Sequence, residues 1–147
     1  MKYVHTNIIA RDWRKLADFY IKVFGCKEVD AKRDLKGKWI DEGTGIDDVH
    51  IEGVHLRLPG SGDDGPTLEI FQYNKSISQE SKKINREGLV HIAFQVDDVG
   101  KTLNAVVEAG GGKLSEIIHH NIPNIGTITF VYVKDPEGNF IELQKYK

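Results

Sequence analysis

The chain of 147 residues is 39% hydrophobic, which suffices for one buried core but is short for two independent domains of typical size. Its 20 basic and 22 acidic residues give a formal net charge of -2, so no summed field indicates a nucleic acid or an anionic membrane as partner. The single cysteine, Cys26, excludes an internal disulfide, and without a signal peptide or an apolar run near about 20 residues we expect a cytoplasmic protein with no membrane partner.

The first half begins with a strand and a helix. Residues 4 to 9 have the pattern of a strand, with a histidine, His5, in second position. Apolar residues from 13 to 24 recur every three or four positions and predict a helix, which Gly25 ends. The remaining strands of this half are expected at three places: 37 to 42, 49 to 58 and 67 to 73.

The second half repeats this order. A strand-like run at 90 to 96 again carries a histidine, His91, in second position. The helix that follows has an apolar stripe, with Asp97 or Asp98 as its N-terminal cap and Gly110 at its end. The remaining strands are expected at two places: 127 to 134 and 140 to 146.

Each half therefore carries a histidine in its first strand and a glutamate, Glu69 or Glu142, between aliphatic residues in its last. The histidine and the glutamate are 64 positions apart in the first half, from 5 to 69, and 51 apart in the second, from 91 to 142. We expect the roughly 13 additional residues to lie within 30 to 66, where Gly, Asp and Lys cluster.

The duplicated order predicts an α+β fold made of two βαβββ modules. We expect one domain over residues 1–147. Its parts are module one at about 1–74, a polar linker at 75–88 and module two at about 89–147.

Strand alternation turns the histidines and glutamates to one side. If the aliphatic neighbours of Glu69 and Glu142 pack against the helices, these carboxylates face the opposite way, and His91 does the same in its strand. Two imidazole nitrogens and two carboxylate oxygens would suit a divalent cation. A lone strand histidine is more often a surface residue, and a glutamate between aliphatic residues is usually exposed, but their occurrence at corresponding positions favours a metal site formed by four residues: His5, Glu69, His91 and Glu142.

The sequence resembles the vicinal oxygen chelate superfamily, which contains glyoxalase I and methylmalonyl-CoA epimerase. The resemblance covers almost the whole chain and implies a cup-shaped mixed sheet with helices outside and a metal inside. It is carried by three segments: His5–Thr6 with Leu16 to Gly25, Gly88 to Val99, and Asp135 to Leu143.

Within that family, a complete His, Glu, His, Glu set resembles bacterial glyoxalase I rather than the dioxygenase relatives, which use two histidines and one glutamate. The resemblance implies a lyase or isomerase in which a divalent ion of nickel, cobalt, manganese or zinc stabilises an enediolate or enolate of a small substrate chelated through adjacent oxygens. By analogy Glu142 is the preferred catalytic base and Glu69 the second candidate.

Two departures leave the substrate open. Glyoxalase I binds glutathione with an arginine shortly after the first histidine, whereas Asn7 to Ile9 are uncharged here. The sequence also has no basic cluster that would indicate coenzyme A. The alternatives are an epimerase-like isomerase acting on a coenzyme A thioester, or a bleomycin-resistance-type protein that binds a ligand without catalysis. A homodimer is expected from the family resemblance.

Several other residues are interpreted as parts of the surface or the core rather than of the metal site. His55 and Arg57 share a strand face and could meet a substrate carboxylate, although a solvated face is favoured. The doublet His119 and His120 is expected in a surface loop. Trp39 could line a hydrophobic groove, although packing in the core is favoured.

Overall fold

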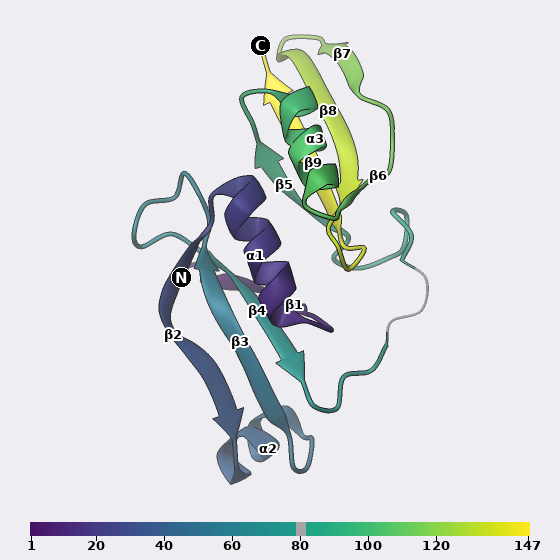
Figure 1. Ribbon diagram of the computed structural model, residues 1–147. Helices are drawn as coiled ribbons and strands as arrows, with labels where there is room; N and C mark the ends of the chain where they lie inside the picture. The colour runs from purple at the N-terminus through teal and green to yellow at the C-terminus, as the bar shows by residue number, and fades with distance from the viewer. Residues whose placement is uncertain (79–81) are drawn as a thin grey trace. The chain divides into compact units, whose positions relative to one another are not determined.

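The computed structural model describes residues 1–78 and 82–147 (Figure 1). Its contacts divide the chain into two compact units, Met1–Ser78 and Gln79–Lys147. The division falls inside the segment 75–88 that was predicted as a linker. That both units form one domain stays a prediction, and each unit is described by itself.

The first unit contains two helices and a sheet of four strands in the order β1-β4-β3-β2. Strand β1 runs parallel to β4, and the other neighbours are antiparallel. The elements are β1 (His5–Ile9), α1 (Trp13–Phe24), β2 (Lys27–Lys36), α2 (Lys38–Thr44), β3 (His50–Arg57) and β4 (Thr67–Tyr73).

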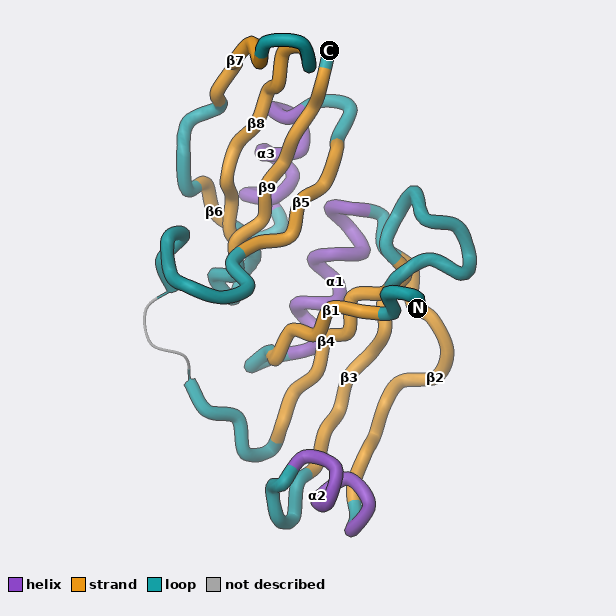
Figure 2. The backbone as a smooth tube through the Cα atoms, turned by 180° about the vertical axis from the view of Figure 1, so that it is seen from behind, coloured by secondary structure: helices purple, strands orange, loops and turns teal. Residues whose placement is uncertain are grey.

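In its described part, residues 82–147, the second unit has one helix and a sheet with the corresponding order β5-β9-β8-β6, with β7 also paired to β8 (Figure 2). Here too the first strand, β5, runs parallel to the last, β9. The elements are β5 (His91–Gln95), α3 (Val99–Glu108), β6 (Gly112–Lys113), β7 (Ile118–Ile122), β8 (Gly126–Lys134) and β9 (Phe140–Tyr146). Two mixed sheets with their own helices confirm the α+β prediction.

Both long helices begin at an aspartate. The Asp12 side chain accepts from the Lys15 backbone N–H at 3.2 Å, and Asp98 accepts from Lys101 N–H at 2.9 Å, so each aspartate satisfies a free donor of the first turn. Asp98, not Asp97, is therefore the cap of α3. Gly25 ends α1 in the left-handed conformation, with φ of 68°.

Each unit buries its own core between helix and sheet. Helix α1 packs on β3 and β4, while α3 packs on β8 and β9. Alternate strand residues supply the sheet side of each core; the fully buried ones include Leu68, Ile70, Ile141 and Leu143. The predicted alternation is thus confirmed, and the faces opposite the helices are left for half-buried polar residues.

The predicted strand at 37 to 42 is wrong, because this segment forms helix α2. Glycines with positive φ bracket it, Gly37 at 97° and Gly45 at 71°. Ile40 packs against the buried cluster of Val49, Ile51 and Phe71, which no local strand pattern could show. The expectation that Trp39 is a core residue is also wrong, since 62% of this residue is exposed.

Three strands were missed, and each depends on pairing with distant residues; one of them, the two-residue β6, pairs with β8. Strand β2 is polar and mostly exposed, yet it pairs along β3. The expectation that His119 and His120 lie in a loop is wrong, because they lie in β7, which pairs with β8. In the described residues 1–78 and 82–147, no helix has the length and apolar character needed to cross a membrane.

Candidate functional site

The polar face of the first sheet gathers side chains from three neighbouring strands. Glu69 of β4 lies between two partners in the sheet register, Asn7 of β1 and His55 of β3. His5 is two residues before Asn7 and therefore points to the same face. This face is opposite the one that packs on α1.

The Glu69 carboxylate is the centre of this cluster. Its Oε1 lies 2.8 Å from His55 Nε2, and its Oε2 lies 3.6 Å from His5 Nε2. Asn7 Nδ2 donates to Oε2 at 2.7 Å. One nitrogen or oxygen from each of His5, His55 and Glu69 lies within 4.8 Å of the other two, which is close enough for the three residues to bind one metal ion.

Both ring nitrogens of His55 have a polar neighbour, and the ring contacts two other rings. Its Nδ1 lies 3.2 Å from Thr67 Oγ1, and its ring makes edge contacts with His5 and Phe71. Burial lowers the pKa of His55, and the negative charge of Glu69 opposes that shift. The residue interpreted as part of a solvated face is therefore 17% exposed and part of the cluster; the favoured interpretation was wrong.

The second sheet has a smaller cluster at the corresponding place. Glu142 of β9 has Ala93 of β5 and Tyr132 of β8 as its register partners. His91 Nε2 lies 3.1 Å from Glu142 Oε2, and the His91 and Tyr132 rings meet edge to face with centroids 5.3 Å apart. Burial and the neighbouring Glu142 carboxylate raise the pKa of Tyr132.

The turn before β9 fixes the position of Glu142. Asp135 is only 3% exposed, and its carboxylate accepts from the backbone N–H groups of Glu137 and Asn139, both at 2.9 Å. The Asn139 side-chain amide donates to the other carboxylate oxygen at 2.7 Å. The segment that most resembles the family is therefore a rigid turn.

The structure brings together the predicted residues in pairs, His5 with Glu69 and His91 with Glu142. That all four bind one metal stays a prediction. Sequence reasoning missed His55 as a neighbour of Glu69, because the connection 58–66 between β3 and β4 leaves their register open.

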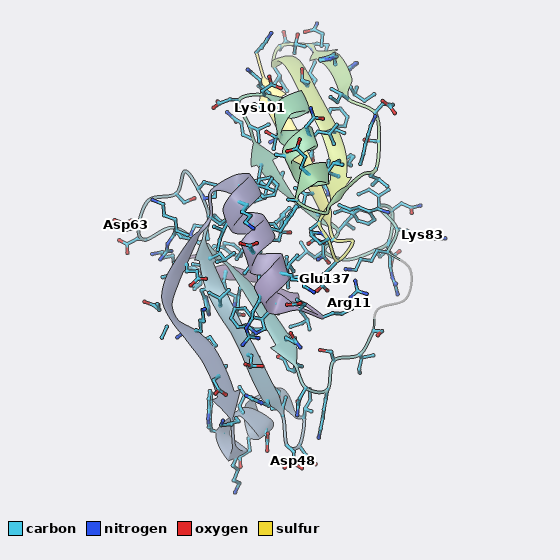
Figure 3. The ribbon with its side chains drawn as sticks, viewed as in Figure 1. Arg11, Asp48, Asp63, Lys83, Lys101 and Glu137 are labelled. Atoms are coloured by element: carbon cyan, nitrogen blue, oxygen red, sulfur yellow. The ribbon has the colours of Figure 1, made fainter. Side chains whose placement is uncertain are left out.

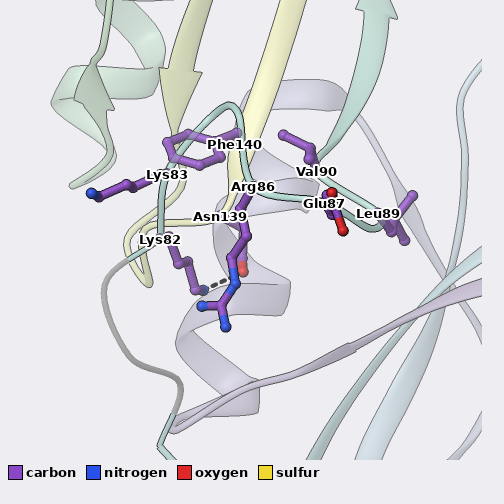
Figure 4. Close-up of a pocket in the computed structure, with 8 residues that line it drawn as sticks. All are labelled: Lys82, Lys83, Arg86, Glu87, Leu89, Val90, Asn139 and Phe140. Atoms are coloured by element: carbon purple, nitrogen blue, oxygen red, sulfur yellow. Dashed lines mark hydrogen bonds between the residues drawn. The ribbon is translucent and has the colours of Figure 1, made fainter.

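A pocket of about 170 Å³ lies in the second unit (Figure 4). Lys82 Nζ donates to Asn139 Oδ1 at 2.5 Å and to the Glu137 carbonyl at 3.2 Å. Lys83, labelled in Figure 3, is exposed. The lining combines basic and apolar residues: Lys82, Lys83, Arg86, Glu87, Leu89, Val90, Asn139 and Phe140. Its three cations lie within the five residues 82–86, a short basic cluster that the sequence analysis missed.

Comparisons with known proteins agree with this architecture. The model of the Glyoxalase/Bleomycin resistance protein/Dioxygenase superfamily matches residues 2–143. A protein of Vibrio cholerae serotype O1 (strain ATCC 39315 / El Tor Inaba N16961), named probable lactoylglutathione lyase, is 28% identical over 150 residues, which cover 99% of this chain and 91% of that protein.

Two solved structures illustrate the shared fold. A glyoxalase family protein from Bacillus cereus matches with a TM-score of 0.78 at 17% identity, covering 99% of this chain and 93% of that one. A variant of glyoxalase I from Zea mays matches with a TM-score of 0.66 at 23% identity, covering 97% of this chain and 45% of that one. At these identities the structures support the fold alone.

Proposed function

We propose that this chain, which belongs to the Glyoxalase/Bleomycin resistance protein/Dioxygenase superfamily, is a metal-dependent lyase or isomerase of the glyoxalase I type. Its substrate would be a small molecule with adjacent oxygen atoms. The observation that carries the proposal is the matched pair of clusters, in which a histidine lies beside a glutamate at corresponding register positions of two sheets.

The proposed metal ligands are His5, Glu69, His91 and Glu142. The donor set fits a divalent ion of nickel, cobalt, manganese or zinc, since imidazole and carboxylate ligands suit all four. Each glutamate is half-buried on a face of its own sheet, where its charge needs compensation that a cation supplies. A bound ion supplies Lewis-acid stabilisation of negative charge on the substrate oxygens.

Glu142 is the proposed base, which takes a proton from the carbon next to a substrate carbonyl. Each oxygen of Glu69 already has a close partner, His55 at 2.8 Å and Asn7 at 2.7 Å, so neither oxygen is free to approach a substrate C–H. Glu142 has His91 at 3.1 Å and a hydrogen bond from the Tyr132 side chain, but it lacks an amide donor at the position of Asn7, where Ala93 stands. We therefore assign Glu69 mainly to binding.

The test has two parts. Titration calorimetry of the metal-free protein with nickel, cobalt and zinc should give about one site per chain, and His91→Ala should weaken it about 100-fold or more, since even partners outside a ligand set contribute about 10- to 100-fold. Incubating candidate substrates in deuterated water should exchange the α proton, as read by NMR. Unchanged binding in His91→Ala, or oxygen uptake with catechols and Fe(II), would contradict the proposal.

A second candidate is an epimerase of coenzyme A thioesters. The cations Lys82, Lys83 and Arg86 around the pocket of the second unit favour it, because they suit the phosphates of such a substrate. A panel that contains 2-oxoaldehydes with thiols and acyl-coenzyme A thioesters separates the two activities. Elemental analysis separates both from a metal-free binding protein of the bleomycin-resistance type.

The assembly and location of the protein are also proposals. We propose a cytoplasmic homodimer that binds neither nucleic acid nor membrane. Size-exclusion chromatography with light scattering measures the subunit number, and a monomer across the working concentration range would contradict the dimer.

A further inference from the structure

We infer that His55 is a third metal ligand of the first unit, so that His5, His55 and Glu69 bind one divalent ion even without the ligands of the second unit. The inference rests on the proposed function only in taking His5 and Glu69 as ligands. It adds a ligand, and it assigns most of the affinity for the ion to one unit.

The three side chains come from adjacent strands on one face of the sheet, namely β1, β4 and β3. Ligand atoms bound at about 2.1 Å to the same ion are about 3.0 to 3.4 Å apart at octahedral or tetrahedral angles. The distances from the Glu69 oxygens to His55 Nε2 and His5 Nε2 are 2.8 and 3.6 Å. Small side-chain shifts therefore suffice to place an ion among them.

The surroundings hold these donors in the orientation that ligands need. Thr67 Oγ1, 3.2 Å from His55 Nδ1, can accept the proton of that nitrogen and leave the Nε2 lone pair directed toward Glu69. Asn7 fixes one Glu69 oxygen through its amide. Metal sites use such partners behind the ligands to set tautomer and orientation.

The second unit lacks this arrangement at corresponding positions. Tyr132 takes the place of His55, Phe140 that of Thr67 and Ala93 that of Asn7. His91 and Glu142 thus form a two-residue cluster, whereas the first unit offers three ligands and two polar partners behind them. Three ligands within one unit can hold an ion that two cannot.

The rival explanation is that His55 only orients Glu69, by donating Nε2–H to its carboxylate while Thr67 donates to Nδ1. The substitution His55→Gln separates the two roles, because the glutamine amide keeps an N–H donor for Glu69 but removes the imidazole. A ligand role predicts a large loss of metal affinity in His55→Gln. A purely orienting role predicts that the affinity stays near the starting value.

The experiment uses the full chain and cobalt(II), read by calorimetry and by paramagnetic NMR of the imidazole N–H protons. The variant His91→Ala/Glu142→Gln should retain one ion and show two shifted imidazole N–H signals. Adding His55→Gln should remove one signal and weaken binding by about 100-fold, as expected for a lost ligand rather than an outer partner. The variant His5→Ala/Glu69→Gln should bind no ion tightly.

A matched control is His50→Gln in the same strand, whose ring pairs with Asp34 at 2.6 Å on the exposed surface. It should leave affinity unchanged, and circular dichroism should show that every variant folds. Loss of all binding in His91→Ala/Glu142→Gln, or no effect of His55→Gln, would overturn the inference. Full binding in His91→Ala alone would instead overturn the four-ligand proposal and leave the role of His55 standing.

Discussion

The two sheets share one strand order but differ in the residues that surround their glutamates. In the first, Glu69 has a histidine and an asparagine as register partners; in the second, Glu142 has a tyrosine and an alanine. One glutamate therefore lies between two nitrogen atoms, and the other lies beside a phenol whose pKa is raised. The difference supports the proposed division, in which binding falls mainly to one half and proton transfer to the other.

A second difference is which strand carries an aromatic residue next to each glutamate. Two residues beyond Glu69, the Phe71 ring covers Gly53 of the neighbouring strand. At the corresponding place in the second sheet the aromatic residue is on the other strand, where Phe130 faces Gln144. The aromatic ring at this place therefore comes from β4 in the first unit and from β8 in the second.

The largest expected effect is on the reaction rate of Cys26, which follows the end of the first helix. Cys26 is 2% exposed, and burial raises the pKa of its thiol to about 11. Its reaction with a disulfide reagent at pH 8 should be about 1000-fold slower than that of a free thiol, since both the thiolate fraction and access fall. The second unit contains no cysteine, so the labelling rate reports the opening of the first unit alone. Fast labelling of the native protein would contradict this protection.

The next effect separates the two glutamates. Glu142→Gln should lower turnover by about 100-fold or more, the contribution of a positioned base, with a smaller fall in metal affinity. Glu69→Gln is the matched variant and should mainly lower metal affinity. Single-turnover rates at saturating metal measure both. Equal rate losses would remove the proposed division between the two halves.

Gly53→Ala tests whether the Phe71 ring needs the space that Gly53 leaves open. A Cβ there would overlap the Ile70 carbonyl oxygen and the Phe71 ring, so we expect a loss of about 2 to 3 kcal/mol in unfolding free energy. The control Gly43→Ala, in α2 with open space around it, should raise that free energy by about 0.5 to 1 kcal/mol. Chemical denaturation followed by tryptophan fluorescence measures both, because Trp13 and Trp39 both belong to the first unit. A neutral Gly53→Ala would mean that both the Phe71 ring and the Ile70 carbonyl move aside without cost.

The smallest effect comes from copying one feature of the first unit into the second. Tyr132→His places an imidazole opposite Glu142 in the background His5→Ala/Glu69→Gln. We expect cobalt affinity to rise only about tenfold, because Phe140 cannot orient the new ring as Thr67 orients His55. Calorimetry measures the change. A gain to the affinity of the first unit would show that the partner behind the histidine does not matter.

Local patterns predicted what depends on neighbours in the sequence. The helix at 13 to 24, the strand alternation around Glu69 and Glu142, and the aspartate cap of α3 all follow from spacing and capping chemistry. Helix α2, strand β7 and the place of His55 could not be predicted, because each is decided by residues that are distant along the chain.

The rigid turn at 135–139 limits how the chain can change in length. Its carboxylate bonds set the point at which β9 begins, so one inserted residue would shift that strand and turn Glu142 toward α3. The longer connection 58–66 has exposed residues at its centre and can take up an insertion before β4 begins. A peptide tag or a loop graft therefore belongs in the connection of the first unit rather than in the turn of the second.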